Sequence, residues 1–559
     1  MRSDFFYVSR IKFILSIKIL LVFFLATIIS CQNKRKDKNK LHVFRYNETA
    51  GITSLDPAFA KDQANIWICN QLYNGLIQLD DSLHIKPCIA KSWEITDNGK
   101  TYTFHLRYDV LFHSSELFKS NAERIVRAKD FVFSFNRIVD EKTVSPGAWI
   151  FKYVLQNANG SYAFTAVNDT TLVIRLKDTY PPFLGILTMK YCSVVSEKVV
   201  NFYGKEFRKH PIGTGPFQFK MWNESQKLIL TKNKDYFEFE NGARLPYIDA
   251  ISVSFIVDKE TAFLEFVKGN FDFLSGVDAA YINELLTKQG TLNLKYTNRF
   301  KMISQPYLNT EYLGFMLDET LNKNRNNPLK NIKIRQAINY GFDRKKMIRY
   351  LRNNIGIPAN KGIVPLGLPS FDQSKIEGYD YNPEKAKQLL AEAGFPDGEG
   401  LPEITIATNA SYLDLCKYIQ QQLNEIGFKI KIDVNPPATL REMIAKSKSD
   451  FFRGSWIADY PDAENYLSMF YSANFCPFGP NYTHFSDKEF DKYYDLSLNE
   501  LNDSIRSRYY EKMDQIIMNN AAVVPLYYDK VLRFVQKNVE GIGINPMNLL
   551  VLKRVRKIN

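Results

Sequence analysis

The sequence predicts an α/β protein, because helical and strand patterns alternate along the chain and the composition suits a packed core. Of its 559 residues, 45% are hydrophobic and 24% are charged, which is ordinary for a globular protein. Apolar residues recur at helical spacing from Leu415 to Ile426, Gly427 ends that pattern, and residues 428–434 then alternate in polarity. A helix, a glycine cap and a strand in succession form a unit of an α/β sheet, and the length allows about three or four domain-sized units.

Two further segments support the same fold class. Residues 100–108 alternate strictly, which predicts a half-buried strand. Its buried face would hold Tyr102, Phe104, Leu106 and Tyr108. Asn382 has the character of a helix cap, Pro383 takes the first helical position, and Gly394 marks the end of that helix. From residue 41 onward no linker rich in proline, glycine or serine interrupts the chain, so we expect interwoven domains.

The first thirty residues have the pattern of a secretory leader, and a lipidation motif follows. Four basic residues precede an apolar run at 19–29, which is too short to cross a bilayer as a helix. The run ends at Ile28-Ile29-Ser30-Cys31, which resembles the lipobox of bacterial lipoproteins. That resemblance implies cleavage before Cys31 and attachment of diacylglycerol to its thiol. A signal-anchor helix, or plain secretion with an incidental cysteine, is the alternative.

Most of the net charge of +13 lies in this leader and in the tether after it. Residues 1–30 hold four bases and one acid, a net +3, and residues 31–40 hold five bases and one acid, a net +4. The remaining 519 residues therefore carry only +6. We expect the tether to be a flexible spacer near a membrane surface. The body has no basic stripe interleaved with aromatic residues, which argues against nucleic acid as a partner.

The sequence contains no recognisable catalytic, metal or cofactor motif. It has no G-x-S-x-G elbow, no P-loop and no G-x-G-x-x-G after a strand. Its six histidines are scattered, and no Cys/His spacing suits a metal site. We therefore expect no enzymatic activity, no catalytic residue, no bound metal and no cofactor. The five cysteines after Cys31 are expected to be small buried hydrophobic residues, and whether two of them form a disulfide stays open.

Nine short blocks between residues 50 and 550 carry a family resemblance. They are SLDPA at 54–58, LYNGL at 72–76, KPCIAKSWE at 86–94, YTFHLR at 102–107, AKDFVFSF at 128–135, GTGPF at 213–217 with NKDYF at 233–237, KIRQAINYGFDR at 333–344, YNPEKA at 381–386 and VPLYY at 524–528. In this order they are similar to the family 5 extracellular solute-binding proteins, the oligopeptide- and dipeptide-binding lipoproteins of ABC transporters. The block at 333–344 is similar to the signature helix of that family.

The resemblance implies a two-lobed clamshell, the periplasmic-binding-protein fold of type II with an extra domain, built from three interwoven domains. Domain I would combine residues 41–75, 201–300 and 521–559. Domain II would be an insertion at 76–200, and domain III would form the second lobe at 301–520. Residues 1–30 would be the signal peptide and 31–40 the charged tether.

The segment at 453–462, RGSWIADYPD, holds the candidate ligand residues. It resembles the family segment in which the aspartate of a W-x-x-D motif pairs with the α-ammonium of a peptide, a role that falls on Asp459. The resemblance also implies that Arg453, six positions earlier, meets the carboxylate end of a short peptide. An acid and a base suit a zwitterion, and an even spacing places both on one face of an extended strand. Trp456 and Tyr460 complete the candidate set.

A purely structural interpretation of these residues stays open. In it Arg453 forms an internal ion pair, Trp456 belongs to the core and Asp459 caps a turn. The sequence also departs from the family pattern in two places. Met316 stands where the family usually has asparagine, and the turn at 112–115 reads F-H-S-S instead of F-H-D-G. These departures affect local contacts and leave the expected fold unchanged.

The resemblance implies a membrane-anchored solute-binding protein of an ABC importer, which captures short peptides between its lobes and delivers them to a permease. The permease and its ATPases would be separate chains, and this chain would be a monomer. Its place would be the bacterial cell envelope, lipid-anchored in the periplasm or on the outer face. One alternative keeps the fold and binds an oligosaccharide, a metal chelate or haem. Others are a membrane-tethered hydrolase with two carboxylates and a structural surface lipoprotein.

Overall fold

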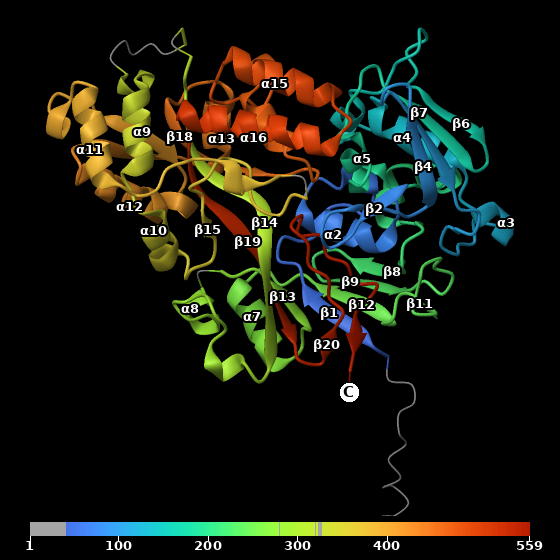
Figure 1. Ribbon diagram of the computed structural model, residues 1–559. Coiled ribbons are helices and arrows are strands. Elements are labelled where there is room, and N and C mark those ends of the chain that lie inside the picture. The colour runs from blue at the N-terminus through green and yellow to red at the C-terminus, as the bar shows by residue number, and fades with distance from the viewer. Residues whose placement is uncertain (1–40, 279, 319, 322–326, 370, 559) are drawn as a thin grey trace, which may run out of the picture. The chain divides into compact units, whose positions relative to one another are not determined.

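The computed structural model describes residues 41–278, 280–318, 320–321, 327–369 and 371–558. Within them, an eleven-stranded mixed sheet has the order β17-β16-β18-β14-β19-β13-β1-β12-β9-β8, and β15 pairs with β19 (Figure 1). Its strands are β1 (Val43–Asn47), β8 (Phe217–Asn223), β9 (Lys227–Lys232), β12 (Ala250–Ser254), β13 (Phe273–Ser275), β14 (Phe300–Phe315), β15 (Ile357–Pro358), β16 (Ile404–Thr408), β17 (Ile430–Val434), β18 (Phe451–Ile457) and β19 (Val523–Gln536).

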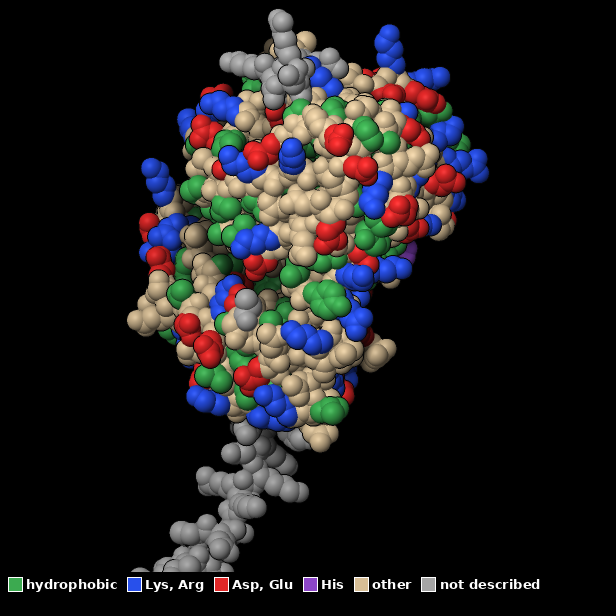
Figure 2. Space-filling view, turned by 90° about the vertical axis from the view of Figure 1, so that its left-hand side faces the viewer, with side chains coloured by type: hydrophobic (Ala, Val, Ile, Leu, Met, Phe, Trp, Pro, Cys, Tyr) green, Lys and Arg blue, Asp and Glu red, His purple; other side chains and the backbone are tan. Residues whose placement is uncertain are grey.

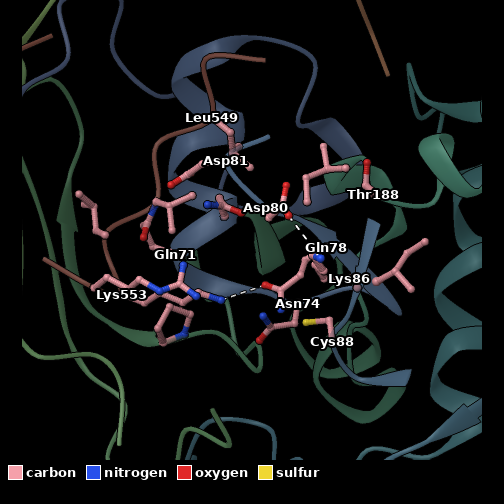
Figure 3. A pocket seen from close by; sticks show the side chains of 18 of the residues that line it. Gln71, Asn74, Gln78, Asp80, Asp81, Lys86, Cys88, Thr188, Leu549 and Lys553 are labelled. Atoms are coloured by element: carbon pink, nitrogen blue, oxygen red, sulfur yellow. Dashed lines mark hydrogen bonds and ion pairs between the residues drawn. The ribbon is translucent and has the colours of Figure 1, made fainter. Parts of the chain in front are cut away.

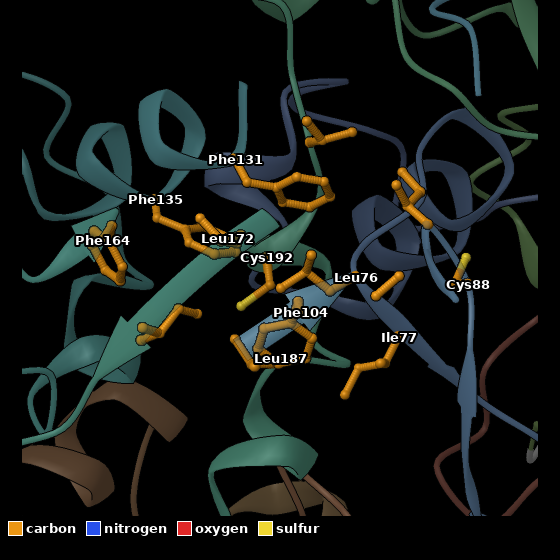
Figure 4. Close-up of a cluster of buried hydrophobic side chains, with 14 of the residues drawn as sticks. Leu76, Ile77, Cys88, Phe104, Phe131, Phe135, Phe164, Leu172, Leu187 and Cys192 are labelled. Carbon is orange, nitrogen blue, oxygen red and sulfur yellow. The ribbon is translucent and has the colours of Figure 1, made fainter. Parts of the chain in front are cut away.

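A four-stranded antiparallel sheet forms separately, in the order β4-β5-β7-β6. Its strands are β4 (Ala90–Thr96), β5 (Thr101–Leu106), β6 (Phe164–Asn168) and β7 (Thr171–Arg175), and the short pairs are β2 (Ile77–Leu79) with β3 (Ile85–Pro87), β10 (Phe239–Glu240) with β11 (Ala243–Arg244), and β20 (Val539–Glu540) with β21 (Arg556–Lys557). Phe131 and Phe135 pack with Phe104 and Leu172 from this sheet in one buried cluster, which Figure 4 shows. The aromatic share of the sequence therefore serves the core here.

The helices connect and cover these sheets (Figure 1). They are α2 (Gln63–Leu72), α3 (Asn121–Arg124), α4 (Ala128–Val139), α5 (Phe183–Ile186), α6 (Glu197–Tyr203), α7 (Lys259–Lys268), α8 (Ile282–Leu285), α9 (Ile332–Tyr340), α10 (Arg344–Leu351), α11 (Pro383–Glu392), α12 (Leu413–Asn424), α13 (Pro437–Ala445), α14 (Glu464–Leu467), α15 (Lys488–Asn499) and α16 (Asp503–Asn519). Among the described residues, none of the helices combines the length and the apolar character that crossing a bilayer requires.

β14 and β19 are long strands at the middle of the large sheet. β14 has 16 residues and β19 has 14. β14 pairs antiparallel with β19 on one edge and with β18 on the other, while β13 pairs with the far end of β19. These two strands therefore join pieces of the chain that are distant in the sequence. The domain boundaries given above remain a prediction.

The segments expected from the sequence are present with small differences. The helix expected after Asn382 is α11, and the Asn382 side chain accepts the N–H of Lys385 at 2.9 Å. The helix expected to end at Gly427 is α12, and β17 follows it. The strand expected at 100–108 is β5, which buries alternate residues. The placement of Tyr108 on its buried face was wrong, because pairing ends at Leu106 and Tyr108 is 79% exposed.

Cysteine burial and surface charge also agree with the sequence. All five described cysteines are buried and form no disulfide, which confirms them as small buried residues. On the face that Figure 2 shows, basic and acidic side chains are interspersed, without a large patch of either sign. Cys31, with the leader and the tether, lies outside the described residues.

Candidate ligand-binding site

Two of the four candidate residues lie on β18, and the other two follow its end. β18 pairs antiparallel with β14, and both Arg453 and Trp456 belong to the paired register. The strand ends at Ile457, and Asp459 and Tyr460 follow in the short connection to α14. A regular strand therefore fixes the first two side chains, while a turn sets the direction of the other two.

Asp459 presents an exposed carboxylate, and no cation of the described residues pairs with it. Its backbone N–H donates to Oδ1 of Asn465 at 3.2 Å. Desolvation by the surrounding protein raises the pKa of the Asp459 carboxyl, and a hydrogen bond with Asn465 opposes the rise only in part. The Asp459 carboxylate is therefore accessible to solvent and yet crowded by protein. Such a group gains more from a cationic ligand than a fully solvated one does.

The segment around residue 190 lies near Asp459. Burial, and then the negative charge of Asp459, raise the pKa of Tyr191 to about 12. Nearby, a Cβ on Gly185 would meet Cδ of Pro461 at 3.5 Å. Residues from the predicted insertion at 76–200 therefore contact the turn that carries Asp459.

Trp456 is half-buried and helps to fix that turn. Its indole N–H donates to Oδ1 of Asn465 at 2.9 Å, and the same oxygen accepts the backbone N–H of Asp459. Asn465 is itself buried, in the first turn of α14. The sequence did not point to Asn465, because an asparagine six positions after Asp459 belongs to no recognised motif.

Tyr460 points into the protein. Its hydroxyl donates to Glu464 and lies 3.0 Å from the hydroxyl of Tyr180, which also donates to Glu464 at 3.1 Å. Tyr494 donates to the other carboxylate oxygen of Glu464. Burial raises the pKa of Glu464, and three tyrosine hydroxyls surround its carboxyl. Tyr460 thus links Tyr180, from the predicted insertion at 76–200, to the turn with Asp459, and its ligand contact stays a prediction.

Arg453 is engaged inside the protein, as the structural interpretation expected. Its guanidinium pairs with the carboxylate of Glu311 on β14 and lies 3.2 Å above the ring of Tyr412. Arg453 is only 8% exposed, and its Nε–H has no hydrogen-bond partner. Burial raises the pKa of Glu311, although the guanidinium opposes that shift. A role for Arg453 toward a ligand stays a prediction.

A second ion pair extends this network. Arg352 donates to Asp529 at 2.8 Å and to the hydroxyl of Tyr527 at 2.8 Å. The Asn309 side chain lies between the pairs, 3.3 Å from Glu311 and 3.4 Å from Asp529. Sequence reasoning missed these groups, because partners more than a hundred residues apart leave no local pattern. Each cation of this network therefore has an anionic partner. Asp459, in contrast, pairs with no cation of the described residues.

The two departures from the family pattern serve packing. Met316 is buried, and its N–H donates to Asp450 O at 2.9 Å. His113 is buried, with Nε2 at 3.0 Å from Gly215 O and Nδ1 accepting the N–H of Gly213 at 3.2 Å. Burial lowers the pKa of His113 to about 4, so the imidazole is neutral and bridges the turn at 112–115 to the glycine block.

A separate polar cavity of about 370 Å³ lies against α2, the β2–β3 hairpin and residues 549–554 (Figure 3). Lys553, which lines it, donates to Oε1 of Gln78 at 2.9 Å and pairs with Glu238. Volume alone would make this cavity a candidate site. Asp459 does not line it, and the charge of Lys553 is already satisfied. The uncompensated carboxylate therefore identifies the candidate site better than cavity size does.

Two known proteins are similar to this chain over most of its length. A 28% identical relative over 491 residues is heme-binding protein A of Haemophilus influenzae, with 85% of each chain covered. The glutathione-binding protein GsiB of Salmonella typhi is 26% identical over 510 residues, covering 89% of this chain and 91% of that one. Both alignments span nearly the whole body of the chain.

Solved structures show the same fold. DppA from Helicobacter pylori, an ABC transporter-associated periplasmic binding protein in complex with the peptide STSA, has a TM-score of 0.70 and 26% identity over 93% of this chain and 98% of that one. HbpA2 from Haemophilus parasuis has a TM-score of 0.79 and 24% identity over 93% of this chain and 100% of that one. These matches confirm the predicted α/β periplasmic-binding-protein fold.

The family model of the bacterial extracellular solute-binding proteins, family 5 (middle), matches residues 84–475. That span covers more than half of the chain and includes the segment with Asp459. The chain therefore belongs to family 5 of the bacterial extracellular solute-binding proteins, the substrate-binding proteins of ABC importers.

Proposed function

We propose that this protein captures short peptides for an ABC importer and holds their α-ammonium group on Asp459. The observation that carries the proposal is an exposed carboxylate, crowded by protein, without a cationic partner among the described residues. The structure of DppA from Helicobacter pylori, similar over 93% of this chain, contains a bound peptide. A peptide amine is the cation that such a site would receive.

The energetics favour an amine at this position. Burial raises the pKa of the Asp459 carboxyl, so its charge is less well solvated than that of a free carboxylate. An ammonium group placed beside it forms a charge-assisted hydrogen bond in surroundings of low dielectric constant. Main-chain hydrogen bonds along the ligand would add affinity with little preference for side chains. Ligand binding would favour a closed form that a permease recognises.

The carboxyl end of the peptide is expected to contribute less. Arg453, the residue predicted to meet it, is already paired with Glu311. A carboxylate ligand would have to compete with Glu311 for the guanidinium. We therefore expect the amine to dominate recognition, and peptides of several lengths to bind.

The cellular setting follows from the N-terminal segment. Cleavage before Cys31 and lipid attachment would tether the protein to a bacterial membrane, with residues 31–40 as the spacer. The permease and ATPase subunits would be separate chains, and the binding protein would act as a monomer. Mass spectrometry of the mature N-terminus tests the lipid on Cys31 directly.

Calorimetric titration of the purified protein with di- to hexapeptides and their N-acetylated forms tests the amine anchor. We expect acetylation to weaken binding at least tenfold, because it removes the charge that pairs with Asp459. Asp459→Asn should weaken binding of the free peptides by a few kcal/mol, about 2–5 for a desolvated charge pair. Glu489→Gln, an exposed carboxylate on α15, is the matched control and should change nothing. Equal affinity for free and acetylated peptides would overturn the proposal.

Haem and glutathione are the ligands to compare in the same experiment, because the names of two relatives specify them. Glutathione also carries a free amine, so its binding should depend on Asp459. Haem offers no amine. A thermal shift with haemin that Asp459→Asn leaves unchanged, without any shift from peptides, would replace the peptide proposal.

A further inference from the structure

The loop between α14 and α15 brings a thiol, an imidazole and a carboxylate into a hydrogen-bonded row. Sγ of Cys476 lies 3.3 Å from Nε2 of His484. Nδ1 of His484 lies 3.2 Å from Oδ2 of Asp318, which follows β14. Oγ of Ser447, which follows α13, is 3.2 Å from both the sulfur and Nε2. Residues distant in the sequence therefore converge on one cysteine.

The hydrogen bonds assign a role to each ring nitrogen of His484. A carboxylate can only accept, so Asp318 takes the Nδ1–H and leaves the lone pair on Nε2. That lone pair faces both the thiol of Cys476, at 3.3 Å, and the hydroxyl of Ser447, at 3.2 Å. The thiol also has a longer contact, 3.8 Å, with Ile444 O. Once Nε2 is protonated, the carbonyl oxygen of Cys476, at 3.2 Å, can accept its hydrogen. The surroundings therefore suit both the neutral and the charged imidazole.

Asp318 is itself held in place. Its Oδ1 accepts the N–H of Thr320 at 2.8 Å and the hydroxyl of Thr320 at 2.6 Å. Burial opposes ionisation, but these bonds and the neighbouring His484 lower the pKa of Asp318 overall. The ring of His484 also stacks on Phe475, with centroids 4.5 Å apart. Asp318 therefore fixes the imidazole of His484 at Nδ1, and Phe475 packs against one face of the ring.

Two members of the row have an unusual backbone. His484 has φ 50° and Ser447 has φ 54°, in the left-handed region that non-glycine residues seldom adopt. Both residues contact Cys476 from these positions. The surrounding structure therefore holds both side chains against the sulfur at some conformational cost.

The other described thiols have different surroundings. Burial raises the pKa of Cys69, Cys192 and Cys416, and it raises the pKa of Cys88 to about 12. No hydrogen bond within the described residues joins any of these four to a histidine; the Cys192 thiol, for example, donates to Ile186 O at 3.6 Å. They serve as internal references for Cys476.

Access to the sulfur is narrow. Cys476 is 4% exposed, and a cavity of about 430 Å³ reaches Asp318, His484 and Phe475 beside it. A bulky or charged reagent would have to displace the loop, whereas a small uncharged one needs only a slight opening. Hydrogen peroxide has that size and that charge.

We propose that Cys476 is a modification site that small hydroperoxides oxidise, with His484 as general base and Asp318 as its positioning residue. Nε2 of His484 takes the thiol proton, and Sγ attacks one peroxide oxygen. The O–O bond breaks, and the imidazolium gives its proton to the departing hydroxide. The sulfur is oxidised to sulfenic acid and hydrogen peroxide is reduced to water. This site is independent of the peptide proposal.

Peroxide treatment of the purified protein, with dimedone to trap sulfenic acid and mass spectrometry of each cysteine peptide, tests the proposal. We expect Cys476 to be labelled at least about tenfold faster than Cys69, Cys192 or Cys416, as base assistance of this kind supplies. Similar labelling rates for all of them would overturn the site.

His484→Asn separates chemistry from packing, because asparagine tolerates the left-handed backbone. We expect the variant to lower the labelling rate of Cys476 at least about tenfold. A loosened fold would expose the thiol and raise the rate, so misfolding cannot imitate this result. His210→Asn is the matched control and should leave the rate unchanged. An unchanged rate in His484→Asn would overturn the role of the imidazole.

Asp318→Asn tests the positioning role through the pH profile. In the native protein we expect the rate to depend less on pH than in the variants, because His484 accepts the thiol proton inside the row. In Asp318→Asn and His484→Asn we expect the rate to rise with pH, as for a free thiol. A parallel pH profile in all three proteins would contradict the hydrogen-bonded row.

Discussion

At the scale of single residues, Glu311 is the buried counter-ion of Arg453. It pairs with Arg453 in a buried position on adjacent strands, where neither charge reaches bulk water. Because a buried charge needs a partner, removing either member alone leaves a large desolvation cost. Glu311 therefore occupies the guanidinium that the family resemblance predicts to meet a ligand carboxylate.

Glu311→Gln should lower the free energy of unfolding by about 3 kcal/mol, because the guanidinium of Arg453 loses its counter-ion. Denaturant unfolding measures this change. The double variant Glu311→Leu with Arg453→Leu should recover most of the loss, since it removes both charges. A double variant as unstable as the single one would mean that packing, and not charge, explains the effect.

The same single variant should change ligand preference. With Glu311→Gln, a tripeptide with a free carboxylate should raise the melting temperature more than it does in the native protein, because it pairs with Arg453. The C-amidated tripeptide lacks that charge and serves as the control, so its shift should be alike in both proteins. Equal gains from both peptides would count against any role for Arg453 at the carboxyl end.

The surroundings of the candidate residues could be predicted from the sequence only in part. The resemblance of residues 453–462 to a family segment singled out Asp459 and Trp456, because that similarity is visible in one stretch of sequence. The partners Glu311 and Asn465 were not predictable. Glu311 lies on another strand, 142 residues from its partner Arg453 in the sequence. The contact of Asn465 with Asp459 depends on the path of the turn between them. Side chains brought together by sheet order leave no trace in a single segment.

At the scale of elements, the local sequence predicted the helix ends and the strand alternation, because these features depend on interactions between neighbouring residues. α11 begins at its asparagine cap and α12 ends near its glycine, since both signals act within one turn. β5 shows the alternation of its sequence up to Leu106. It does not extend to Tyr108, because a strand lasts only as long as its neighbours pair with it. Strand pairing depends on the whole sheet, so the end of β5 could not be predicted from its own sequence.

The turn at 112–115 should make stability depend on pH. His113 is neutral in the fold, with its pKa lowered from 6.5 to about 4 by burial. Below pH 6.5 the unfolded chain binds a proton that the fold excludes, so stability should fall as pH falls from about 6.5 to 4. The loss should approach about 3 kcal/mol at pH 4.

Denaturant unfolding at several pH values measures this loss for His113. His113→Gln keeps a donor and an acceptor but cannot titrate, so its stability should fall less steeply between pH 6.5 and 4. His84→Gln replaces an exposed histidine and should follow the native protein. Identical slopes in all three proteins would rule out His113 as the source.

At the scale of the whole molecule, a tyrosine contact joins two parts that the sequence assigns to different lobes. Tyr180 comes from the predicted insertion at 76–200, and it meets Tyr460 and Glu464 from the predicted second lobe. The ring of Tyr180 also stacks on Tyr153, with centroids 3.8 Å apart. This contact lies next to the turn with Asp459, so it should favour the arrangement that encloses a ligand.

Tyr180→Phe should weaken peptide binding by up to about tenfold, the equivalent of one or two hydrogen bonds. The ring stays and only the hydroxyl is lost, so the core should keep its packing. Calorimetric titration measures the affinity, and small-angle scattering should show a larger mean radius without ligand. Tyr162→Phe, a ring outside this contact, is the control. Unchanged affinity with an unchanged radius would mean that the contact does not support closure.

The position of β19 has a consequence for how the protein is made. β19 lies between β14 and β13 in the large sheet, yet a ribosome synthesises it after the other ten strands. Until then β13 and β14 each lack a neighbour, and their edges expose unpaired N–H and C=O groups. The two halves of the large sheet therefore stay unjoined while most of the chain is being translated, because β19, the last of its strands to be made, connects them.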